Sequence, residues 1–129
     1  MLKFKLTLSD IQAAYAKINF KPNDPKWSGY TYSRNSCQCC PLAALAVTYG
    51  FNVFGMDKYS SPADDMVKFL AQVYNVDKED LWDFITAYDG NEYDLHNPNG
   101  PYVELGRECR QWARHVHNHT AFFLTGQVY

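Results

Sequence analysis

The sequence lacks any long hydrophobic run, and none of its apolar segments approaches the roughly 18 residues that a membrane-spanning helix needs. The first residues also lack the apolar centre, about 7–15 residues long, of a secretory signal peptide. No internal repeat, linker or low-complexity segment appears, and the net charge is only −2. These absences predict a single domain over residues 1–129 that lies in the cytoplasm and does not bind a membrane.

Cysteine is scarce, with four residues in 129, which is too few for a secreted domain held together by disulfides. We therefore expect reduced thiols in the cytosol. Three of the four cysteines fall within four positions, and the chain has no second close pair. The cluster and the distant fourth cysteine are candidate ligands of a structural zinc ion: Cys37, Cys39, Cys40 and Cys109.

The segment that follows this cluster predicts a buried helix over Pro41–Tyr49. Pro41 suits the first turn of a helix, because its missing N–H has no partner there, and Cys40 then falls at the N-cap. Nearly every side chain from Leu42 to Val47 is small or apolar. A helix that is apolar on all sides is a buried one, so we place this helix at the centre of the fold.

Apolar residues recur at helical spacing in four further segments, each with a capping residue or Pro near its start. The predicted fold class is mainly α, with about five helices in all, packed around the buried central helix over Pro41–Tyr49, and a small β element. The four further helices are expected over Ser9–Ile18, Pro62–Tyr74, Lys78–Tyr88 and Val103–His117. The β element is expected from the Lys3 arm, the Tyr30 region and the Phe122 tail.

The helices predicted over Pro62–Tyr74 and Lys78–Tyr88 have the spacing of a helix-turn-helix motif. The second helix of such a motif needs basic residues to contact DNA phosphates. Here it begins with four acids and one lysine, so we predict no DNA binding through it. We expect its acidic face to bind a protein with a basic surface, and Trp82 to act as an aromatic anchor. The predicted binding residues are Asp77, Glu79, Asp80, Trp82 and Asp83.

A catalytic hypothesis rests on Cys40, because a thiol at a helix N-terminus is stabilised as the thiolate. The run from Gln38 through Cys40, with a histidine ahead of an apolar strand near the C-terminus, resembles papain-like cysteine peptidases of the bacteriocin-leader type. That resemblance implies Cys40 as the nucleophile and His119 as its base. The glycine that follows the nucleophile in that family is Pro41 here.

Four short motifs together resemble a group of small bacterial and phage proteins to which no activity is assigned. They are Leu8–Tyr15, Cys40–Leu45, Phe84–Gly90 and Leu105–Arg107. The resemblance covers most of the chain and implies a cytosolic, mostly helical domain.

Three functional classes follow from these features. The first is a non-catalytic protein-binding module without a cofactor, the second is a structural zinc domain, and the third is a cysteine-dependent hydrolase. The first is our leading prediction, because it uses the clearest electrostatic feature of the chain.

Overall fold

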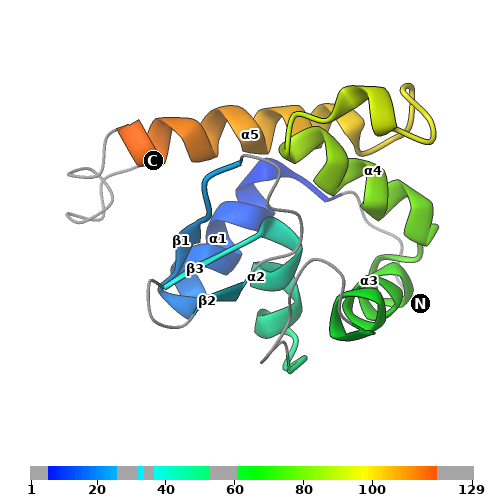
Figure 1. Ribbon diagram of the computed structural model, residues 1–129. Coiled ribbons are helices and arrows are strands. Elements are labelled where there is room, and N and C mark those ends of the chain that lie inside the picture. The colour runs from blue at the N-terminus through cyan, green and yellow to red at the C-terminus, as the bar shows by residue number, and fades with distance from the viewer. Residues whose placement is uncertain (1–5, 26–31, 34–36, 53–60, 119–129) are drawn as a thin grey trace.

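The computed structural model describes residues 6–25, 32–33, 37–52 and 61–118 (Figure 1). These residues form five α-helices, a short 3-10 helix and three two-residue strands, which confirms the predicted fold class. The helices are α1 (Leu8–Ile18), α2 (Pro41–Thr48), α3 (Ser61–Tyr74), α4 (Lys78–Tyr88), η1 (Glu92–Asp94) and α5 (Val103–Asn118). The strands are β1 (Lys21–Pro22), β2 (Tyr32–Ser33) and β3 (Gln38–Cys39).

Helix α2 is buried, as its apolar sequence predicts. Pro41 begins the helix, Cys40 is its N-cap residue, and the exposed fractions of Leu45 and Ala46 are 2% and 0%. The helix ends one residue before the predicted end, because Tyr49 leaves the helical conformation. Tyr49 is 47% exposed and packs edge-on against an aromatic ring of α3, so it does not belong to the buried stripe.

Helix α1 begins one residue earlier than its predicted start, and its cap is a different residue. Thr7, rather than Ser9, is the N-cap residue. The Thr7 hydroxyl accepts from the Asp10 amide at 3.3 Å, and the Asp10 carboxyl accepts from the Thr7 amide at 2.9 Å. This reciprocal capping box satisfies two amides that the first turn would otherwise leave without partners.

The helices pack in two groups that share one core. Helix α2 lies against α1 and α3, while α4 packs along α5 (Figure 1). Helices α3 and α4 are joined by the predicted three-residue turn, in which Asn75 has a left-handed conformation with φ 57°. Within the described residues, no helix is both long and apolar enough to cross a bilayer.

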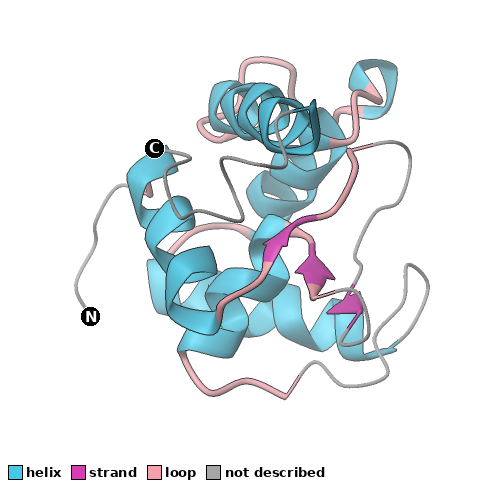
Figure 2. Ribbon diagram, turned by 90° about the vertical axis from the view of Figure 1, so that its left-hand side faces the viewer, coloured by secondary structure: helices cyan, strands magenta, loops and turns pink. Residues whose placement is uncertain are grey.

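The small sheet confirms the predicted β element in part, because β2 lies in the predicted Tyr30 region while β1 and β3 were not predicted. Strand β3 pairs in parallel with β1 and antiparallel with β2, giving the order β1-β3-β2 (Figure 2). All three strands lie between α1 and α2 in sequence. The predicted strands at the Lys3 arm and the Phe122 tail lie outside the described residues.

Side chains from three helices hold the segment around β1 and β3 against the core. The Tyr15 hydroxyl donates to the Cys39 carbonyl at 2.8 Å, and the Tyr88 hydroxyl donates to the Asn23 carbonyl at 2.7 Å. Arg110 Nη1 donates to the Pro25 carbonyl at 2.6 Å. Buried carbonyl groups are costly without a donor, so these bonds stabilise the positions of β3 and of the segment that follows β1.

Candidate functional site

The acidic surface is defined here as Asp77, Glu79 and Asp80, at the start of α4. Asp77 is the N-cap residue and is exposed, as is Glu79, and Asp80 is partly buried. Burial is the main cause that raises the pKa of Asp80, followed by the negative charges of Asp77, Asp83 and Glu79. Within the described part of the chain, no ion pair joins any of the three to a basic side chain.

Asp83 does not belong to this surface, which corrects its prediction as an exposed binding residue. Its exposed fraction is 1%. Its carboxyl oxygens accept from the backbone amides of His96 and Asn97 at 2.8 and 3.0 Å, and Oδ1 lies 3.1 Å from the His96 ring nitrogen Nδ1. The loop after α4 folds back over this residue, so Asp83 holds a loop in place rather than facing solvent.

Trp82 is partly buried and packs against the hydrophobic core. Lys78 and Glu79 precede it by four and three residues, so all three share one face of α4. The indole therefore combines a fixed position with a partly accessible surface next to the acidic surface. This geometry is compatible with the predicted role as an aromatic anchor.

The cysteine cluster does not form a metal-binding arrangement. Cys37 is exposed, whereas Cys39, Cys40 and Cys109 are buried, and none of the four is in a disulfide. Burial is the main cause that raises the pKa of both the Cys39 and Cys109 thiols, which disfavours the thiolate that binds zinc. Among the described residues, no three His, Cys, Asp or Glu side chains gather where they could hold an ion.

The predicted nucleophile Cys40 lies at a helix N-terminus, as expected, but its exposed fraction is 0%. A substrate therefore cannot reach its sulfur in this conformation. The predicted base, His119, lies outside the described residues. Cys40 therefore has the helix N-terminal position that the catalytic hypothesis requires, but its thiol is not accessible to a substrate.

Thiol labelling in the native state provides a direct test of this burial pattern. We expect one of the four thiols, Cys37, to react rapidly with an aromatic disulfide reagent, because the other three are buried. A Cys37→Ser variant should then show no rapid reaction until it is unfolded. Rapid labelling of Cys40 in that variant would contradict the burial and would restore the hydrolase hypothesis.

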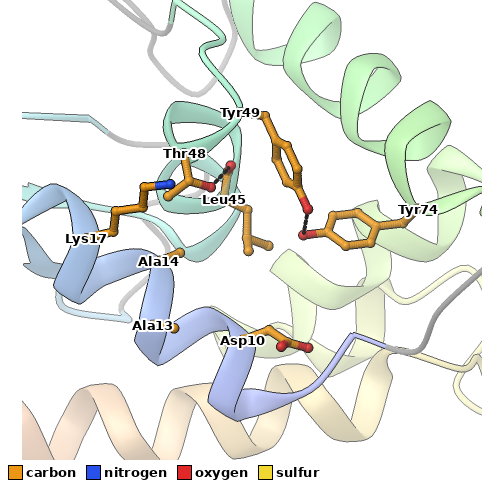
Figure 3. A pocket seen from close by; sticks show the side chains of 8 residues that line it. All are labelled: Asp10, Ala13, Ala14, Lys17, Leu45, Thr48, Tyr49 and Tyr74. Carbon is orange, nitrogen blue, oxygen red and sulfur yellow. Dashed lines mark hydrogen bonds between the residues drawn. The ribbon is translucent and has the colours of Figure 1, made fainter. Parts of the chain in front are cut away.

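A concave feature that sequence analysis did not identify lies between α1, α2 and α3. This hollow has a volume of about 290 Å³ (Figure 3). Helix α1 contributes four of the lining residues, the end of α2 three, and the end of α3 one: Asp10, Ala13, Ala14, Lys17, Leu45, Thr48, Tyr49 and Tyr74. In the sequence, the feature that points to this hollow is the pair Ala13 and Ala14 between Asp10 and Lys17, because small side chains leave space on the face of a helix.

Comparison with models of known protein families, with curated proteins and with solved structures finds no match. The resemblances described from the sequence therefore remain predictions, and the proposals below rest on the geometry of this chain.

Proposed function

We propose that this protein is a small, non-catalytic, cytoplasmic binding module that recognises a protein with a basic surface through the acidic surface at the start of α4. The observation that supports this proposal is the exposure of Asp77 and Glu79 beside Asp80, with no ion pair from these three acids to a basic side chain among the described residues. It indicates negative charge that no described basic side chain neutralises. The same charge is unfavourable for DNA phosphates, so the proposed partner is a protein.

The Asp80 carboxyl group lowers the stability of the folded state at neutral pH, chiefly because it is partly buried. A carboxyl group whose pKa is higher in the folded than in the unfolded state binds more protons when folded, so stability falls as the pH rises through that range. Asp80 has this sign of shift. Because burial is the larger cause, this shift describes the environment of Asp80, and the proposed binding role rests on the exposed Asp77 and Glu79.

The test is a charge-reversal variant that leaves the buried Asp83 intact. Asp77→Lys with Glu79→Lys should fold normally, because both side chains are exposed. We expect the variant to lose proteins that the wild type captures from a lysate in a salt-sensitive manner, since charges separated by more than about 8 Å are screened at physiological ionic strength.

The matched control reverses two acids elsewhere with the same change in net charge. Asp94→Lys with Glu108→Lys alters exposed residues in η1 and α5, and capture should persist. Equal capture by both double variants, or capture that is insensitive to salt, would contradict the proposed role of the acidic surface.

A further inference from the structure

The hollow between α1, α2 and α3 carries one positive and one negative side chain on the same helix. Asp10 lies in the first turn of α1 and Lys17 in the last. Figure 3 shows the Lys17 ammonium beside Thr48 and the Asp10 carboxyl group on the opposite side, below Tyr74. The two residues are seven positions apart on the helix, which corresponds to an axial rise of about 10.5 Å between them. At that distance they do not form an ion pair with each other.

Both charged groups retain capacity for a ligand. Asp10 accepts from Thr7 through Oδ2 only, which leaves Oδ1 without a donor from the described residues. The Lys17 ammonium forms no ion pair with a described residue. The negative Asp10 at the start of α1 and the positive Lys17 at its end also interact favourably with the helix dipole. Replacing either residue would therefore change stability even without a ligand, so the test has to detect ligand binding itself.

The wall between α2 and α3 is aromatic and held in one orientation. The Tyr49 hydroxyl donates to the Tyr74 hydroxyl at 3.3 Å, and the two ring planes are 83° apart. Tyr49 also packs edge-on against Phe69, with ring centroids 6.4 Å apart. Leu45 and the alanines of α1 contribute apolar lining. A tyrosine wall offers an apolar face together with hydroxyl groups, which suits the backbone of a peptide.

We propose that this hollow binds a short peptide with free termini, two or three residues long. Its ammonium would face Asp10 and its carboxylate would face Lys17. Three extended residues span at most about 10–11 Å, which is comparable with the axial rise of about 10.5 Å between Asp10 and Lys17 on α1. The volume of about 290 Å³ also lies at the small end of ligand sites, which are about 300–1,000 Å³. The site is independent of the acidic surface on α4.

The experiment is a titration of the ¹⁵N-labelled full chain with triglycine, followed by amide chemical shifts. We expect saturable shifts confined to the ends of α1, α2 and α3 that line the hollow. N-acetyl-triglycine lacks the ammonium and triglycine amide lacks the carboxylate, and each should bind about tenfold more weakly. A tenfold loss is the size expected for one hydrogen bond between charged groups.

The Lys17→Met variant assigns the carboxylate to one end of the hollow. It should bind triglycine and triglycine amide equally, yet still prefer triglycine to its N-acetyl form. The control Lys68→Met removes an exposed lysine of α3 that does not line the hollow, and it should retain both preferences. Because Asp10 also caps α1, the N-acetyl peptide tests its role without a substitution.

Three outcomes would overturn the proposal: no saturable shifts with triglycine, shifts centred away from the hollow, or equal binding of the three peptides to the wild type. None of these outcomes bears on capture through the acidic surface, so the two proposals fail separately.

Discussion

The Asp83→Ala variant is expected to lose about 2–4 kcal/mol of unfolding free energy, because hydrogen bonds to a charged acceptor contribute about 1.5–3 kcal/mol each and the loss of a buried network is among the costly changes. Asp83 is 1% exposed and accepts the amides of His96 and Asn97. Removing the carboxyl group leaves both amides without that acceptor and opens a space beneath the loop. Urea denaturation measures the loss.

Two comparisons identify the cause of this loss. Asp77→Ala removes an exposed carboxyl group from the same helix and should change stability by no more than about 0.5 kcal/mol. Asp83→Asn keeps one acceptor oxygen, so its cost should fall between the other two. Hydrogen exchange should accelerate at the amides of His96 and Asn97 in Asp83→Ala before it changes in α2. If Asp83→Ala is as stable as Asp77→Ala, the loop does not depend on this residue.

Helices were predictable because their determinants are local. The bounds of α4 match the prediction, since an N-cap residue, an apolar stripe and a glycine after the last turn all lie within one segment. The start of α1 was missed although a local signal was present. Thr7 and Asp10 stand three residues apart, which is the spacing of a capping box, but Ser9 and Gln12 have the same spacing, so the local pattern alone does not choose between the two caps.

The sheet and the role of Asp83 were not predictable in the same way, because both depend on contacts between distant segments. Two-residue strands are too short to show an alternating pattern, and β1 pairs with β3 across 15 residues of intervening chain. In the sequence, Asp83 is one acid of an acidic run. Its burial results from a loop that returns 13 and 14 residues later to donate two amides.

The candidate sites also differ in whether their determinants are local in the sequence or depend on contacts between distant segments. The acidic surface was predictable from composition, apart from Asp83, because three of its predicted carboxyl groups are near one another along the chain. The hollow was not, because its lining comes from three helices and depends on how they pack. The burial of Cys40 likewise follows from the neighbours of α2, and the position of the thiol at a helix N-terminus does not reveal it.

The contact between α4 and α5 leads to the second large effect, at Gly106. A Cβ atom added there would lie 2.5 Å from the Phe84 carbonyl oxygen and 2.8 Å from Ala87 Cβ. The nearer atom belongs to the backbone of α4, so a side-chain rotation cannot relieve the clash. Gly106→Ala should therefore destabilise the protein by about 2 kcal/mol, since overpacking typically costs about 1–3 kcal/mol.

This result would be opposite in sign to intrinsic helix preference, which favours alanine over glycine by about 1 kcal/mol in a helix interior. Gln111→Ala, on the exposed face of the same helix, should leave stability nearly unchanged and serves as the matched control in thermal and urea unfolding. Adding Ala87→Gly to Gly106→Ala should not restore stability, because the Phe84 carbonyl remains in place. Full recovery in that double variant would mean that the Ala87 side chain, and not the backbone of α4, sets the distance between the two helices.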